Sequence, residues 1–267
     1  MIMSYEELKE RYNPEGSSLR KGQLRMVEML KFIDEFCRNN NLTYWLDGGT
    51  LLGAVRHGGF IPWDDDTDIC MPLEDMLKFK KLMIHQNPSK EFILQCHETD
   101  HAYYRSQWIV LRDLKSEYLQ DSKFHNSLKY KGLQVDIFPL EKDVPLFLKK
   151  FADTIQFRFI NRATQSEKKL YRMIRPFRNC MWLFLNHFII PVCRLFKKKN
   201  DYYNMAYGIP FYHKRFIKDI YPLKKAKFED SYFNVPNNVD SYLTNLYGDW
   251  RKIPSQIKTH KVEIVIY

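Results

Sequence analysis

Three aspartates at alternating positions, Asp64, Asp66 and Asp68, are the residues best suited to chemistry in this sequence. In an extended segment, side chains at alternate positions point to one face, so these carboxylates can converge. Mg²⁺ prefers oxygen ligands and leaves part of its coordination sphere to water and phosphate, so converging carboxylates are typical of phosphoryl-transfer sites. An acidic run of this kind also occurs as a solvated loop, and the spacing alone favours neither interpretation.

A further carboxylate and a glycine turn favour the metal-site interpretation. Asp136 stands alone in the apolar run 133–138, where a buried carboxylate is costly unless it is paired, hydrogen-bonded or bound to metal. The turn Gly48-Gly49-Thr50 follows an apolar strand and opens a helix, and backbone N–H groups at a helix N-terminus bind phosphate oxygens. The combination predicts a phosphoryl-transfer site that joins this turn to the carboxylates.

Helices and strands in alternation must position these residues. Apolar residues at helical spacing predict helices over 19–38, 50–56 and 73–86. Apolar runs bounded by glycine, proline or polar residues predict strands over 42–46, 66–71, 92–96, 108–111 and 133–138. From residue 144 onward the pattern becomes mainly helical and basic.

The expected fold class is therefore α/β (α+β), with a mixed sheet and flanking helices. We expect a single domain over 1–267, made of an α/β core at 19–141 and a basic, mainly helical C-terminal subdomain at 142–267.

Composition favours an intracellular globular protein. With 267 residues and 45% hydrophobic content, the chain can bury a sizeable core. The five cysteines contain no CxxC pair, which predicts neither a disulfide framework nor a cysteine zinc site. The N-terminal residues lack the apolar run of a secretory signal, so we expect a cytoplasmic location.

The basic charge is concentrated in one region. Residues 142–227 hold 20 Lys and Arg against 5 Asp and Glu, which favours an acidic partner such as nucleic acid, anionic lipid or a polyanionic glycan. Within this region, the aromatic segment 181–196 is followed by Lys197, Lys198 and Lys199. It is too short and interrupted for a transmembrane span, but it suits peripheral contact of 181–199 with the inner face of the cytoplasmic membrane. A core helix is an equal alternative.

Three stretches of the sequence resemble the LicD family of phosphocholine transferases, whose relatives include the fukutin-type ribitol-phosphate transferases. The most specific is Leu46 to Met71, LDGGTLLGAVRHGGFIPWDDDTDICM. The second is GLQVDIFPL at 132–140, and the third combines Phe228-Glu229 with Tyr242-Leu243 and the run 247–250. The resemblance covers residues 20–140 and 226–260, whereas 142–225 is similar only in its general character.

The resemblance implies a nucleotidyltransferase-like fold, a metal ion (Mg²⁺ or Mn²⁺) and a CDP-activated donor such as CDP-choline. Asp66 and Asp68 match the metal-binding DxD of the family, and Asp136 matches its third carboxylate. Asp64 is a further metal ligand by the same match, and Gly48, Gly49 and Thr50 match the donor-phosphate turn. The resemblance does not fix the phospho-alcohol, and the cysteine-rich zinc element of fukutin-type relatives has no counterpart here.

Four further residues are weaker candidates for the site. Arg56 and His57 end the helix after the glycine turn and are predicted to bind donor phosphate and shape the site, although a cap favourable to the helix dipole is the alternative. Trp63 is the aromatic residue that we expect to contact the donor, because aromatic faces attract a quaternary ammonium. His260 follows the C-terminal motif and is the weakest of the four.

The predicted function is a magnesium-dependent transferase that moves phosphocholine, or a similar phospho-alcohol, to a cell-surface glycan such as lipopolysaccharide or teichoic acid. The acceptor can be lipid-linked. Two alternatives remain open: a nucleotidyltransferase that adds a nucleoside monophosphate to a small molecule or RNA, and a non-catalytic basic protein that binds nucleic acid or a membrane surface. Nucleic acid is the less favoured partner, because it leaves the aspartate spacing without a reason.

Overall fold

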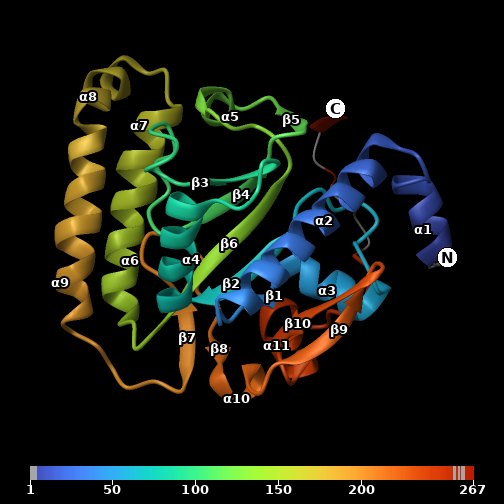
Figure 1. The fold of residues 1–267 in the computed structure, drawn as a ribbon. Helices are drawn as coiled ribbons and strands as arrows, with labels where there is room; N and C mark the ends of the chain where they lie inside the picture. Colours follow the sequence, from blue (N-terminus) through green and yellow to red (C-terminus); the bar gives the residue numbers. More distant parts are fainter. Residues whose placement is uncertain (1–4, 255–256, 258, 260–261) are drawn as a thin grey trace.

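The computed structural model describes residues 5–254, 257, 259 and 262–267 and is built around one mixed sheet (Figure 1). The strand order is β1-β2-β6-β4-β3, and β7 and β8 extend the sheet from the far end of β6. Strands β2 and β6 run parallel, while β1, β3, β4 and β7 pair antiparallel with their neighbours. The bounds are β1 Trp45–Leu46, β2 Asp68–Pro72, β3 Phe92–Gln95, β4 Ile109–Asp113, β6 Gln134–Lys142, β7 Tyr202–Met205 and β8 Arg215–Phe216.

Three helices from the first half of the chain pack against this sheet. Helix α2 (Ser18–Asn39) begins at Ser17, whose side chain accepts a hydrogen bond from the Arg20 backbone, and it buries an apolar stripe. Helix α4 (Leu73–Gln86) follows β2 directly, and both α2 and α4 contact β6. Helix α3 (Gly48–His57) joins β1 to the loop before β2. The predicted helices and the mixed α/β class are confirmed.

A long helical segment lies between β6 and β7, and we call it the helical insertion (residues 146–194). Its first arm comprises α6 (Leu146–Thr154), η1 (Ile155–Asn161) and α7 (Arg162–Gln165). Its second arm comprises α8 (Lys169–Phe184), η2 (Leu185–Ile189) and α9 (Ile190–Arg194). The two arms lie side by side at one edge of the molecule (Figure 1, left). They enclose a small core of their own around Ala152, Ile160, Trp182 and Leu185.

The chain after the helical insertion is less helical than we predicted. Strands β9 (Lys224–Phe228) and β10 (Ser231–Val235) form a hairpin, and β7 and β8 belong to the main sheet. One face of the hairpin buries Phe228 and Phe233, whereas the other face exposes charged side chains to solvent. The lysines of β9 make its strand pattern hard to recognise in the sequence. The mainly helical expectation for 142–267 is met by the insertion, and the segment 202–235 adds four strands to it.

The remaining elements lie around the sheet. They are α1 (Tyr5–Tyr12), β5 (Ser116–Gln120), α5 (Lys123–Ser127), α10 (Ile217–Ile220), α11 (Val239–Tyr247) and β11 (Val262–Ile266). Strand β11 returns to pair with β5, far from it in sequence. Strand β2 begins at Asp68 and not at residue 66, so Asp64 and Asp66 lie in the loop before it.

Candidate active site

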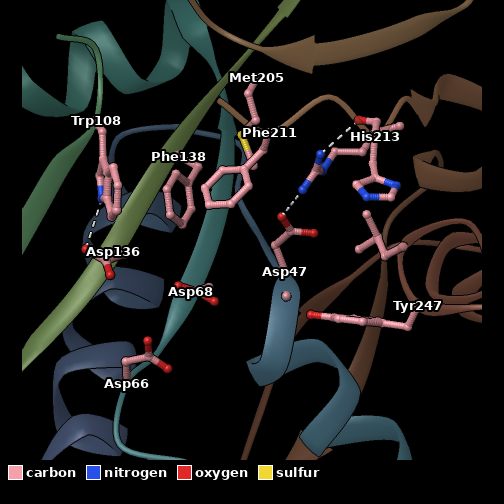
Figure 2. Close-up of a pocket in the computed structure, with 13 residues that line it drawn as sticks. Asp47, Asp66, Asp68, Trp108, Asp136, Phe138, Met205, Phe211, His213 and Tyr247 are labelled. Atoms are coloured by element: carbon pink, nitrogen blue, oxygen red, sulfur yellow. Dashed lines mark hydrogen bonds and ion pairs between the residues drawn. The ribbon is translucent and has the colours of Figure 1, made fainter. Parts of the chain in front are cut away.

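Three carboxylates converge where β2 and β6 begin. Asp68 is the register partner of Asp136 in the parallel pair, and Asp66 precedes Asp68 on the entering loop. One carboxylate oxygen from each of the three lies within 4.8 Å of the others. Figure 2 shows them at the base of a single cavity. The structure thus brings together three of the four residues that the sequence predicted as metal ligands.

Backbone hydrogen bonds fix Asp68 against the start of α3. The Asp47 amide donates to the Asp68 carbonyl over 3.1 Å, and the Asp68 amide donates to the Thr50 hydroxyl over 2.8 Å. Thr50 is buried, so its side chain fixes the start of β2, which carries Asp68. This is a contact that the sequence did not predict for Thr50.

The two glycines of the turn are required by the carboxylates. Gly48 has φ +56°, and a Cβ atom there would lie 2.5 Å from Asp68 Oδ2. A Cβ atom on Gly49 would lie 2.7 Å from Asp64 Oδ2. Real Cβ atoms do not approach oxygen so closely, so any larger residue would displace the carboxylates. The N-terminus of α3 therefore faces the acidic cluster directly.

Burial and mutual repulsion raise the pKa of these carboxyl groups. Burial is the main cause for Asp68, whose pKa is well above its usual value, and the charges of Asp66 and Asp136 add to the shift. Burial, followed by the Asp66 charge, raises the pKa of Asp136 to about 7. The pKa of Asp64 is raised by burial and by Asp66. A divalent cation offsets such repulsion, and an all-oxygen donor set suits Mg²⁺ or Mn²⁺, so these residues fit the predicted metal.

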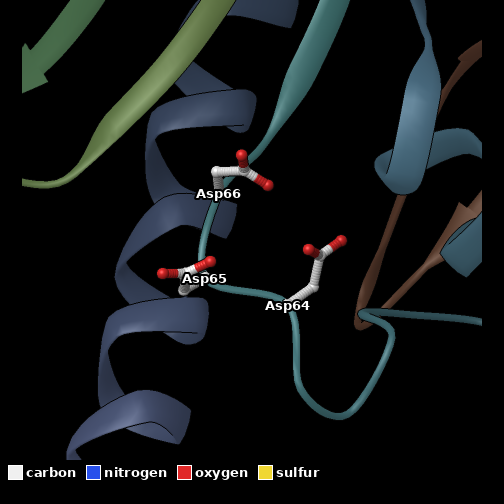
Figure 3. Close-up of side chains that lie close together, drawn as sticks. All are labelled: Asp64, Asp65 and Asp66. Atoms are coloured by element: carbon white, nitrogen blue, oxygen red, sulfur yellow. The ribbon is translucent and has the colours of Figure 1, made fainter. Parts of the chain in front are cut away.

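Asp64 and Asp65 extend the cluster along the loop (Figure 3). Oxygens of Asp64, Asp65 and Asp66 also lie within 4.8 Å of one another. Asp65 is buried and accepts a hydrogen bond of 2.6 Å from the Tyr118 hydroxyl. Asp64 therefore remains predicted to bind the metal directly or through water. Asp65 instead accepts its hydrogen bond from another side chain of the protein.

An aromatic wall adjoins the carboxylates in the same cavity. The cavity has a volume of about 350 Å³, and Trp108, Phe138 and Phe211 line one side of it. The rings of Trp108 and Phe138 are 4.7 Å apart, and those of Phe138 and Phe211 are 5.8 Å apart. The Trp108 indole N–H also donates to Asp136 Oδ1 over 3.0 Å. One tryptophan therefore belongs to both the aromatic wall and the carboxylate cluster.

The opposite side of the cavity is polar and comes from the C-terminal half of the chain. His213, Arg215 and Tyr247 line it together with Asp47 (Figure 2). Arg215 donates to Asp47 Oδ2 over 2.6 Å, and the Tyr242 hydroxyl donates to Asp47 Oδ1 over 2.8 Å. Burial alone would raise the pKa of Asp47, but Arg215 and these hydrogen bonds outweigh it and the pKa is lowered. Asp47 thus fastens the C-terminal half to the glycine turn, and its side chain does not cap α3.

Comparison with known proteins is consistent with this geometry. Residues 41–170 match the LicD/FKTN/FKRP nucleotidyltransferase domain. The lipopolysaccharide cholinephosphotransferase LicD of Haemophilus influenzae is 26% identical over 254 residues, which span 90% of this chain and 93% of that protein. The chain is therefore similar to the LicD family, through the family domain at 41–170 and through LicD itself over 90% of its length.

Shorter segments of the chain are similar to other proteins. The human ribitol 5-phosphate transferase FKRP is 64% identical over 33 residues, which span 12% of this chain and 7% of that protein. An uncharacterised protein of Rickettsia typhi is 44% identical over 63 residues, which span 24% of this chain and 20% of that protein.

Three residues that were predicted to contact the donor do not line the cavity. Arg56 donates to the Trp250 carbonyl over 2.9 Å and to His57 Nε2 over 2.9 Å, at the end of α3 opposite Gly48. Trp63 packs on the main core and meets Tyr12 edge to face at 5.7 Å. Each of these side chains thus has a local structural contact, and its contact with the donor stays a prediction. His260 lies outside the described residues.

Several residues that line the cavity were not predicted as site residues. Trp108 was visible as an aromatic residue near the motifs, and Tyr247 lies in a motif that carries the family resemblance. Phe211, His213 and Arg215 have no local signal in the sequence. Phe211 and His213 enter the cavity from the connection between β7 and β8, and Arg215 is the first residue of β8.

Proposed function

We propose that the protein is a phosphotransferase that moves phosphocholine, or a closely related phospho-alcohol, from a CDP-activated donor to a hydroxyl of a cell-surface glycan such as lipopolysaccharide. The transfer of a phospho-alcohol to a glycan is supported by the names of two relatives, the cholinephosphotransferase and the ribitol 5-phosphate transferase. The CDP donor and the Mg²⁺ or Mn²⁺ dependence are part of the proposal.

The observation that carries the proposal is the contact between the carboxylate cluster and the aromatic wall. Asp136 and Phe138 are alternate residues of β6 and so point to the same face, about 7 Å apart along the strand. A phosphoryl group needs the metal held by the carboxylates, and a quaternary ammonium is attracted to the faces of Trp108 and Phe138. One cavity thus offers both groups of phosphocholine a matching surface.

In this mechanism Asp66, Asp68 and Asp136 would hold the metal, which would neutralise charge on the donor diphosphate. The start of α3 presents backbone N–H groups to the same phosphates. The acceptor oxygen forms a bond to the phosphorus that carries the alcohol, while the bond from that phosphorus to the bridging oxygen breaks and CMP leaves. A carboxylate of the cluster positions the acceptor hydroxyl and accepts its proton. Alignment and charge stabilisation supply most of the rate.

Mass spectrometry of the products tests the proposal. The protein is incubated with Mg²⁺ or Mn²⁺, a cell-envelope glycan extract and a panel of CDP-alcohols that includes CDP-choline. Free CMP together with a glycan that has gained a phospho-alcohol supports the proposal and names the donor. Transfer of the nucleotide moiety to the acceptor would establish nucleotidyl transfer in its place. No turnover with any donor, combined with a salt-sensitive gel shift on nucleic acid, would point to the non-catalytic alternative.

A further inference from the structure

The outer side of the helical insertion exposes an unusual amount of apolar surface. Within the described residues, thirteen of the twenty-four large apolar side chains that are exposed fall in 146–196. Scattered exposed apolar residues are normal on soluble proteins, whereas a contiguous concentration marks an interaction surface.

The second arm of the insertion has two apolar sides. Trp182, Leu185 and Ile190 point inward and are buried. On the outer side, Met173 and Phe177 are each 64% exposed and Phe188 is 57% exposed, and Leu195 and Phe196 follow at the end of the arm. The spacing of Met173, Phe177, Phe184 and Phe188 places these side chains on one helical face. The core alternative for 181–196 thus describes the inner side of this arm, and the outer side needs another explanation.

The charges around this face are almost all positive. Residues 146–199 contain 13 Lys and Arg against 2 acidic residues. Both acidic residues have basic partners, since Asp153 pairs with buried Lys149 and Glu167 pairs with Lys123. Lys168, Lys169 and Arg172 are exposed near the start of the second arm, and the exposed run Lys197 to Lys199 follows its end. The face is therefore apolar along its length and basic at both ends.

We propose that this outer face docks on the surface of a bilayer that contains anionic phospholipids. Phenylalanine, leucine and methionine side chains enter the boundary between headgroups and acyl chains, while flanking lysines meet anionic headgroups. A second copy of the chain is a poorer occupant, because the basic ends would face one another and lysine is depleted in protein interfaces. No helix among the described residues is both long and apolar enough to span a membrane, so the contact is interfacial.

The inner side of the insertion links the docked face to the cavity. Asn186 Oδ1 on η2 accepts hydrogen bonds from Ser106 and Gln107, which immediately precede Trp108. Lys149 on α6 donates to the carbonyls of Ala206 and Ile209, on the segment that leads to Phe211. Both ends of the aromatic wall are therefore fastened to the docking element. If the proposed function holds, docking fixes the cavity relative to a lipid-linked acceptor; the docking itself does not depend on it.

The single exposed cysteine provides a probe of the docked face. Cys180 lies on the second arm between Phe177 and Phe184, and the other four cysteines are buried. An environment-sensitive fluorophore on Cys180 should shift to the blue with vesicles of phosphatidylglycerol and phosphatidylcholine in equal parts, and not with phosphatidylcholine alone. Flotation of the unlabelled protein should give the same result, and binding should weaken as salt is raised. An unchanged spectrum with both vesicles, or equal binding to both, would overturn the proposal.

Matched variants separate docking from folding and from catalysis. Phe177→Ser with Phe188→Ser should lower vesicle binding at least about tenfold, because two large apolar groups no longer enter the interface. Tyr232→Ser, which changes a comparably exposed ring on β10, should leave binding unchanged. Lys197→Glu with Lys198→Glu and Lys199→Glu should also abolish binding, whereas Lys224→Glu with Lys227→Glu on β9 should not.

Two further measurements complete the test. Asp68→Asn should still bind vesicles, so that a failure of the proposed function is distinguishable from a failure of docking. Sedimentation equilibrium in the absence of lipid should show a monomer. A dimer that the Phe177→Ser, Phe188→Ser variant dissociates would show that the face is an interface between two copies, and would overturn the bilayer proposal.

Discussion

Asp68 on β2 and Asp136 on β6 are direct partners across a parallel strand pair. Parallel strands begin at the same edge of a sheet, so two carboxylates at matching positions project side by side. Asp136 is buried and Asp68 is partly buried. Removal from solvent is the largest cause of the raised pKa of both carboxyl groups; the charge of Asp66 adds to both shifts, and the charge of Asp136 adds to that of Asp68. The protein therefore maintains a local repulsion that a shared divalent cation would relieve.

Replacing one carboxylate should separate stability from activity. We expect Asp68→Asn and Asp136→Asn to raise the melting temperature of the metal-free protein, because each removes a buried like charge. Both should lose the thermal stabilisation that Mg²⁺ gives the parent protein, and transfer should fall at least about a hundredfold. Calorimetry with and without Mg²⁺ checks this. Asp230→Asn, on the exposed turn between β9 and β10, is the control; an intact Mg²⁺ effect in the site variants would contradict the metal assignment.

The glycine turn allows a comparison between two alanine substitutions. Gly48 and Gly58 both have positive φ, but a Cβ atom on Gly58 meets nothing within 4 Å, whereas one on Gly48 would clash with Asp68. Gly58→Ala should cost about 1 kcal/mol of unfolding free energy, which is the cost of the left-handed backbone alone. Gly48→Ala should cost more and should also weaken Mg²⁺ binding. Urea denaturation and metal titration of the two variants measure the difference. Equal effects would show that the clash is absorbed elsewhere.

The aromatic wall should discriminate between donors. Phe211→Leu keeps an apolar side chain but removes a ring face, so the KM for CDP-choline should rise about tenfold with little change in kcat. The KM for a CDP-alcohol without a quaternary ammonium should stay the same. Phe211→Tyr should restore the affinity for CDP-choline. Steady-state kinetics with paired donors check this, and a similar rise for both donors would show that Phe211 only shapes the cavity.

His57 should make the protein less stable in mild acid. Burial, together with the Arg56 charge, lowers the pKa of His57 from 6.5 to about 4. Between these values the unfolded chain binds a proton that the folded chain does not, so stability should fall as the pH drops from 6.5 towards 4. His57→Gln keeps an acceptor for Arg56 and cannot titrate, so its loss of stability over this range should be smaller. Melting temperatures across the range measure the effect, with exposed His85→Gln as the control; parallel curves for parent and His57→Gln would disprove it.

The first half of the fold could be predicted because its signals are local. The apolar spacing that predicts helix α2, and the apolar run that predicts the strand around Asp136, each lie within one continuous segment. The turn at Gly48 is predicted by its glycine residues. The Asp47–Arg215 ion pair could not be predicted, since 168 residues separate its partners and Arg215 lies among other basic residues. Strand β9 was missed for a related reason, because its lysines resemble the basic helices before it. Arg56 was predicted from its position after the turn, but a ten-residue helix carries it to the far end of α3.

The helical insertion is attached to the rest of the protein at one place in the sheet, so its outer side can change in sequence independently of the active site. Strands β6 and β7 pair directly, and the Asp143 side chain accepts a hydrogen bond from the Asn200 amide over 2.7 Å, so the insertion leaves and re-enters the sheet at one place. On its inner side Lys149 and Asn186 support the aromatic wall, whereas the side chains of its outer side are exposed to solvent. If the outer side docks on a bilayer as proposed, substitutions there change where the enzyme acts in the cell and leave its chemistry the same.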